Sequence, residues 1–157
     1  KLIKYKNKNN IGISWKSFNN RYSSDKSLDL DNFKDIFELP NCNVFNLQYG
    51  DVADEINNFN NKINELLHIE DLDLYNDFEG IASLLKSLDI FITVSNSTAH
   101  LAGSLGVKTL LIKPNKYALF HYWNQKNNKT PWYNSVELIE RENFLKGSIN
   151  LENYLNL

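Results

Sequence analysis

Residues 89–112 constrain the fold of this chain most strongly, because they resemble a strand, a polar turn, a short helix and a second strand. The sequence there is DIFITVSNSTAHLAGSLGVKTLLI. Residues 89–94 form a short, β-branched, apolar run, which is typical of a strand covered on both faces of a parallel sheet. Residues 99–105 favour a helix that Gly106 ends. Residues 107–112 are apolar and β-branched again, so the stretch predicts a β-α-β unit.

The polar turn inside this unit consists of residues that accept hydrogen bonds from the free amides at the start of a helix. They are Ser95, Asn96, Ser97 and Thr98. A helix that begins beyond the carboxyl end of a parallel strand presents unpaired N–H groups and the positive end of its dipole. The turn therefore predicts an anion site at this edge of the sheet.

Strand and helix patterns alternate along the rest of the chain. Apolar runs predict strands at residues 11–15, 43–48, 136–139 and within 63–69, and helical spacing predicts helices at residues 28–39, 52–61, 78–88 and 149–157, with a polar loop at 16–26. This alternation predicts an α/β fold with a Rossmann-like parallel sheet flanked by helices. We expect residues 1–10 to be an N-terminal extension and residues 11–157 to be the Rossmann-like domain.

Length and composition narrow the classes of protein. The 157 residues suit one domain, and a net charge of −2 offers no electrostatic reason to expect nucleic acid as a partner. Cys42 is the single cysteine, which excludes an internal disulfide and fits a reducing compartment. No apolar run approaches the roughly 20 residues of a transmembrane segment, so we expect a soluble, cytoplasmic domain. The lack of methionine suggests a piece of a longer protein or a chain whose initiator is gone.

The string TVSNSTAHLAGSLGVKTLLI resembles the donor-binding motif of the glycosyltransferase family 9 and heptosyltransferase group, especially the glycosyltransferase-like domains linked to tetratricopeptide repeats. Three further segments agree in order: GISWKS at residues 12–17, NLQYGD at 46–51 and TPWYNS at 130–135. Four motifs in register are more specific than one. The resemblance implies an inverting, metal-independent GT-B enzyme in which two Rossmann-like domains face each other, with this chain as the C-terminal half that holds a nucleotide sugar. It also implies that an N-terminal acceptor-binding domain or a repeat domain, with the catalytic base, lies outside this chain.

The candidate nucleotide-binding residues gather at three predicted strand ends. Lys16 follows the first strand and matches a Lys or Arg position in the resembling proteins, so we expect it to meet the phosphates; a solvated loop lysine is the alternative. His100 falls in the first helical turn, where it could donate to a phosphate oxygen or simply pack. Gln48 ends the second strand and could contact base or ribose. The full predicted set is Lys16, Gln48, Ser95, Asn96, Ser97, Thr98, Ala99 and His100, with the catalytic residues unknown.

Four further interpretations complete the prediction. Ser95 stands where many heptosyltransferases carry an acid, and Gly103 indicates a close approach to a neighbouring strand. We interpret Trp132 and Tyr133 as a hydrophobic anchor for the last loop rather than part of the site, and Tyr49 as either a packing residue or a ligand contact.

Metal chemistry and a non-enzymatic role are the competing hypotheses. Asp-x-Asp triplets stand at residues 29–31 and 71–73, but both lie in acid-rich segments typical of helix starts and loops. We therefore expect no metal, and no cofactor besides the nucleotide-sugar substrate. The alternative function is a catalytically degenerate Rossmann-like scaffold or protein-interaction domain.

Overall fold

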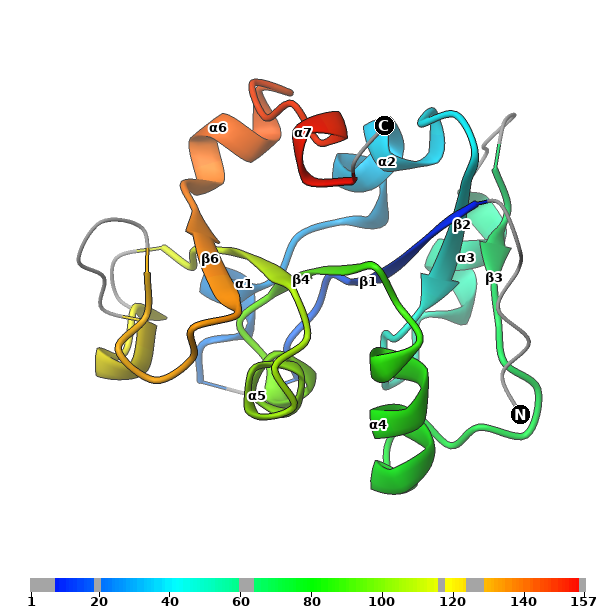
Figure 1. Cartoon of the computed structure of the whole chain (residues 1–157), viewed down its shortest axis with the longest axis horizontal. Coiled ribbons are helices and arrows are strands. Elements are labelled where there is room, and N and C mark those ends of the chain that lie inside the picture. The colour runs from blue at the N-terminus through cyan, green and yellow to red at the C-terminus, as the bar shows by residue number, and fades with distance from the viewer. Residues whose placement is uncertain (1–7, 19–20, 60–63, 116–117, 124–128, 156–157) are drawn as a thin grey trace.

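The computed structural model describes residues 8–18, 21–59, 64–115, 118–123 and 129–155, and its centre is a six-stranded parallel sheet (Figure 1). The order is β3-β2-β1-β4-β5-β6, in which every neighbouring pair is parallel. This is the order of a doubly wound, Rossmann-like sheet, and it confirms the predicted fold class. The strands are β1 (Asn9–Ser14), β2 (Cys42–Asn46), β3 (Leu66–Leu67), β4 (Ile90–Val94), β5 (Thr109–Ile112) and β6 (Val136–Ile139).

Short helices connect the strands and cover both faces of the sheet. They are α1 (Ser23–Lys26), the 3-10 turn η1 (Leu30–Phe33), α2 (Lys34–Phe37), α3 (Ala53–Asn58), α4 (Phe78–Lys86), α5 (Ser97–Ser104), the 3-10 turn η3 (His121–Trp123), α6 (Arg141–Leu145) and α7 (Glu152–Leu155). Helices α4 and α5 lie on one side of the sheet, and α2, α6 and α7 lie on the other (Figure 1). In the described part of the chain, no helix has both the length and the apolar composition needed to cross a bilayer.

The two faces of the sheet build separate parts of the core, because successive strand residues point to opposite faces. Ile11 and Ile13 of β1 pack with Phe33 and Phe37 beneath η1 and α2. Phe91 of β4 points the other way and packs with leucines of α4 and with Ala102 of α5. Both faces of the central strands are therefore dry, which explains their nearly continuous apolar sequences.

Several predicted boundaries are wrong for physical reasons. Strand β1 starts at Asn9, so the last two residues of the predicted extension belong to the sheet. Asn43 Nδ2 of β2 donates a hydrogen bond to Asn10 Oδ1 at 3.0 Å and holds this end of the strand. The predicted loop at residues 16–26 contains α1. The predicted helix at 28–39 is split into η1 and α2, since Asp29 and Asn32 form a capping box around a 3-10 turn. Residues 1–7, 19–20, 60–61, 63 and 156–157 of the predicted segments lie outside the described residues.

Candidate functional site

The start of α5 lies directly after β4, and its geometry depends on one side chain. Asn96 is the N-cap: its Oδ1 accepts a hydrogen bond from the Ala99 amide at 3.0 Å. Its Nδ2 donates to Ser14 Oγ at 2.7 Å and to the Lys16 carbonyl at 3.3 Å. The helix therefore begins at Ser97, two residues earlier than predicted, and Asn96 ties it to the end of β1, at the point where the strand order reverses.

Two backbone amides remain open at this helix start. Among the described residues, the N–H groups of Ser97 and Thr98 have no hydrogen-bond partner, whereas that of Ala99 is capped. Ser97 is exposed and Thr98 is buried. Because the helix dipole adds to these free donors, the first turn of α5 favours an anion of the size of a phosphate group.

Gln48 lies two residues beyond β2, and its buried side chain holds the chain that leaves β1. Its Oε1 accepts hydrogen bonds from the amides of Trp15 at 2.8 Å and Lys16 at 2.7 Å, and its Nε2 donates to the Tyr49 carbonyl at 2.6 Å. The predicted position at the carboxyl edge is thus correct. Both the oxygen and the nitrogen of the Gln48 side-chain amide form hydrogen bonds within the protein, so Gln48 orients the loop. Its contact with base or ribose stays a prediction.

Lys16 lies at the same edge, with its ammonium already paired. Its Nζ is 2.6 Å from Glu55 Oε2 of α3, which also accepts from Trp15 Nε1 at 2.9 Å, while Glu55 Oε1 accepts from the Leu30 amide at 2.8 Å. Burial raises the pKa of Glu55, but the hydrogen bonds from these donors and the Lys16 charge outweigh burial and lower it. The Lys16 charge is therefore shared with Glu55, and its contact with phosphate stays a prediction.

Ser95 and His100 face a cluster of rings. Ser95 Oγ accepts from Trp123 Nε1 at 2.8 Å, and the Trp123 ring stacks on His100 with centroids 4.6 Å apart. His100 Nδ1 lies 3.0 Å from the Tyr133 hydroxyl. Desolvation, aided by the charge of Lys26, lowers the pKa of His100 and so favours its neutral imidazole. This geometry agrees with the packed-histidine alternative, and the phosphate contact of His100 stays a prediction.

The lack of a side chain at Gly103 lets the ring of Tyr133 pack directly against α5. A Cβ atom at this position would lie 2.6 Å from Cγ of Tyr133, so only glycine admits the ring. The predicted close approach at Gly103 is confirmed, but the neighbour is the Tyr133 ring and not, as predicted, a strand. Tyr133 packs as the predicted anchor, whereas the Trp132 side chain is 59% exposed.

A cavity of about 350 Å³ opens beside the start of α5. We call it the aromatic cavity. The sequence pattern predicted Ser97 and Thr98 as ligand contacts and left Tyr49 open, but it did not predict Phe18, Tyr75 or Phe78. The residues that line the aromatic cavity are Phe18, Tyr49, Leu74, Tyr75, Phe78, Ile81, Ser97, Thr98 and Leu101.

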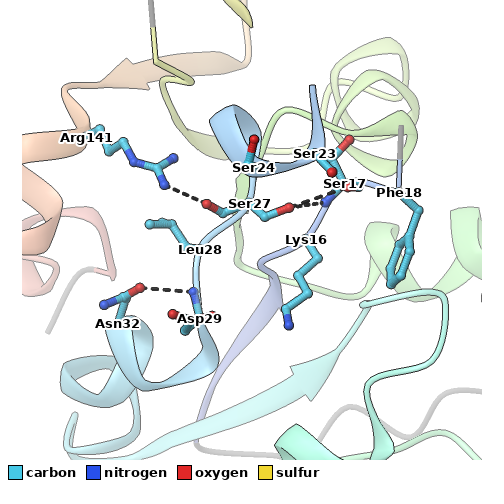
Figure 2. A pocket seen from close by; sticks show the side chains of 10 residues that line it. All are labelled: Lys16, Ser17, Phe18, Ser23, Ser24, Ser27, Leu28, Asp29, Asn32 and Arg141. Carbon is cyan, nitrogen blue, oxygen red and sulfur yellow. Dashed lines mark hydrogen bonds between the residues drawn. The ribbon is translucent and has the colours of Figure 1, made fainter. Parts of the chain in front are cut away.

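A second, polar cavity of about 520 Å³ lies beside the residues that follow β1 (Figure 2). Many of its polar groups bond to one another. Arg141 donates to the Ser27 carbonyl at 2.6 Å, Ser27 Oγ accepts from the Ser17 amide at 3.0 Å, and the Asp29 amide donates to Asn32 Oδ1 at 3.0 Å. Lys16 and Phe18 also line it, and Phe18 borders both cavities.

Metal and thiol chemistry find little support in the described residues. No group of three or more His, Cys, Asp or Glu side chains within them is placed to hold a metal ion. Asp29 belongs to the capping box before η1, and Asp73 accepts hydrogen bonds from Tyr75 and Asn76 in a turn. Burial raises the pKa of the Cys42 thiol, which makes it a weak nucleophile.

Fold and site together define a Rossmann-like α/β domain with an open helix start at its topological switch point. Over 139 residues the chain is 27% identical to Protein FlbA of Caulobacter vibrioides, a match that covers 85% of this chain and 22% of FlbA. The chain thus spans about a fifth of the length of that relative. No family model matches the sequence, and no solved structure matches it.

Proposed function

We propose that this chain is the donor-binding domain of an inverting, metal-independent glycosyltransferase and that it holds the diphosphate of a nucleotide sugar at the start of α5. The observation that carries the proposal is the pair of open amides of Ser97 and Thr98 at the switch point of a Rossmann-like sheet. The resemblance of residues 93–112 to the donor motif of glycosyltransferase family 9 points to the same ligand.

The surrounding polar residues support a diphosphate in particular. Asn96 and Gln48 together bond to the Lys16 backbone, at 3.3 Å and 2.7 Å, and so hold this residue beside the N-cap of α5. If the Lys16 ammonium turned from Glu55 to the ligand, it would add a positive charge to the helix dipole, and the leaving diphosphate of a donor carries the negative charge that both would stabilise. Transfer itself would need an acceptor-binding partner domain, and a cytoplasmic location belongs to the same proposal.

Calorimetric titration of the 157-residue chain with UDP, ADP and GDP sugars tests the proposal. We expect at least one of them to bind with micromolar to millimolar affinity and to be displaced by its free nucleoside diphosphate. If the chain is folded and none of them binds at millimolar concentration, the proposal fails.

A second candidate function is a scaffold that has lost the reaction. One observation favours it: the polar side chains of Gln48, Ser95 and Asn96 bond within the protein, and the Lys16 ammonium is paired with Glu55. A scaffold predicts that replacing Lys16 and His100 with alanine leaves partner binding unchanged. The donor-binding function predicts that the same replacements lower nucleotide affinity while the fold stays stable.

A further inference from the structure

We propose that the aromatic cavity holds the nucleobase of the donor by stacking, and that the site therefore accepts nucleoside diphosphates with different bases. This inference rests on the proposed function, since the base is placed here only if the diphosphate lies at the start of α5. The cavity meets that helix start directly, because Ser97 and Thr98 form part of its wall. Its volume of about 350 Å³ lies within the range of small-molecule sites.

The chemistry of the lining divides the ligand into two parts. None of the nine side chains that line the aromatic cavity carries a charge: four are aromatic, three are aliphatic, and the other two are Ser97 and Thr98. The group inside the cavity is therefore neutral and presents a broad apolar face. The group at the open amides of Ser97 and Thr98 is an anion. A nucleotide joins these two parts, a planar base and a charged diphosphate.

The rings of this cavity are unusually open to solvent. Phe18 is 43% exposed, Tyr75 is 64% exposed and Phe78 is 63% exposed, and these three are among only six large hydrophobic residues exposed in the described part of the chain. Their convergence on one cavity leaves apolar area uncovered beside an anion site. A stacked base would cover these faces.

Local hydrogen bonds fix the backbone that carries two of these rings, Tyr75 and Phe78. Asp73 accepts hydrogen bonds from the Asn76 side chain at 2.8 Å and from the Tyr75 amide at 2.8 Å, and these bonds lower the pKa of Asp73. Asp77 caps α4 by accepting from the Gly80 amide at 2.8 Å, which fixes the first residue of that helix, Phe78. The wall is therefore largely formed before binding, which reduces the entropy lost on binding.

A glycine seats the ring of Phe18. Gly50 has φ +86°, and a Cβ atom there would lie 2.4 Å from Cε2 of Phe18, so the ring packs directly on the turn after β2. Its neighbour Tyr49 lies between Phe18 and Tyr75, with ring centroids 5.7 Å and 5.8 Å away. The three rings thus form a continuous wall.

The polar cavity is a poorer place for a base. Its rim includes the charged groups of Lys16, Asp29 and Arg141, and Phe18 is its one aromatic residue (Figure 2). In the aromatic cavity, no carboxylate, amide or guanidinium side chain is present to read a base edge in a bidentate manner. Stacking alone tolerates any base, because every base has a π-face.

Two exposed rings allow a clean test. We would titrate the 157-residue chain with ADP, UDP, GDP and inorganic pyrophosphate by calorimetry, and repeat this for Tyr75→Ala and Phe78→Ala. Trp132→Ala is the matched control, since its ring is similarly exposed, at 59%, and does not line the cavity. All three side chains are over half exposed, so their removal leaves the core intact; circular dichroism checks the fold.

We expect each cavity variant to weaken all three nucleotides about 5- to 100-fold, to leave pyrophosphate affinity within twofold, and to differ from the Trp132→Ala control, which keeps wild-type affinity. We also expect the three bases to differ by less than about tenfold. Unchanged nucleotide affinity in the cavity variants, or a hundredfold preference for one base, overturns this inference while the diphosphate site stands. If neither pyrophosphate nor any nucleotide binds the folded chain, the proposed function itself fails.

Discussion

The polar residues at the carboxyl edge of the sheet and the aromatic residues beside them are organised in opposite ways. Gln48 and Asn96 are buried and direct their amides to the protein backbone and to Ser14. Tyr75 and Phe78 leave most of their rings in contact with solvent. The difference indicates that the polar side chains position the site, while the backbone amides of Ser97 and Thr98 and the exposed ring faces are available to a ligand.

Removing the Asn96 side chain should produce the largest change in stability. Asn96→Ala deletes the cap on the buried Ala99 amide and the donor to Ser14 Oγ. We expect the free energy of unfolding to fall by about 2 to 4 kcal/mol, measured by urea titration. Ser104→Ala, at the exposed end of the same helix, should change it by less than about 0.5 kcal/mol. If Asn96→Ala lowered the free energy of unfolding by no more than Ser104→Ala does, the Asn96 side chain would not be what positions the site.

A charge at the start of α5 should separate stability from binding. Ser97→Asp places a carboxylate at the positive end of the dipole, which favours the helix by about 0.3 to 1 kcal/mol but repels a diphosphate. We expect nucleoside diphosphate affinity to drop at least tenfold in calorimetry without any loss of stability. Ser97→Ala keeps the backbone amide and should retain affinity within about threefold. Equal affinities for Ser97→Asp and wild type would show that the anion binds elsewhere.

The Glu55 network should appear in the acid dependence of stability. Its donors lower the folded-state pKa of Glu55 below the ordinary value of 4.5. This contribution is complete above that pH and is lost as pH falls through the folded-state value. Urea titrations from pH 7 to pH 3 should therefore show a shallower acid loss for Glu55→Gln than for wild type. Parallel curves would mean that Glu55 adds nothing to the network.

Replacing Lys16 should have only a small effect on stability. Its side chain is 30% exposed and pairs with Glu55, so Lys16→Met should cost less than about 1 kcal/mol in urea titration. We expect nucleoside diphosphate affinity to fall a few-fold, with Lys113→Met as the control, since the Lys113 ammonium also pairs with a glutamate, Glu140. An affinity identical to wild type would remove Lys16 from the site and leave the amides of α5 as its main feature.

Local signals explain why the β4-α5-β5 unit could be predicted. Strand and helix periodicities and the stop at Gly106, with φ +69°, act within a few residues. The local sequence does not single out the residue that caps the helix, because four consecutive side chains from Ser95 to Thr98 have the chemistry to do so. The tertiary bond from Asn96 to Ser14, 82 residues away, decides among them.

The roles of the candidate residues depend on distant partners that no local pattern contains. Gln48 was placed at the correct edge, but its acceptance of the Trp15 and Lys16 amides requires β2 to lie beside β1. The aromatic cavity unites Phe18, Tyr49 and Tyr75 from three separate connections. Only the strand order brings these segments together, so their joint surface could not be predicted from the sequence.

Amide chemical shifts of the 15N-labelled chain test the central claim most directly. On addition of ADP or UDP, the account predicts that the backbone amides of Ser97 and Thr98 show the largest shifts, with smaller ring-current changes at Tyr75 and Phe78. Lys108, before β5 at the opposite edge of the sheet, should not move. Nucleotide binding that leaves Ser97 and Thr98 unshifted, with changes concentrated near Lys108, would contradict it.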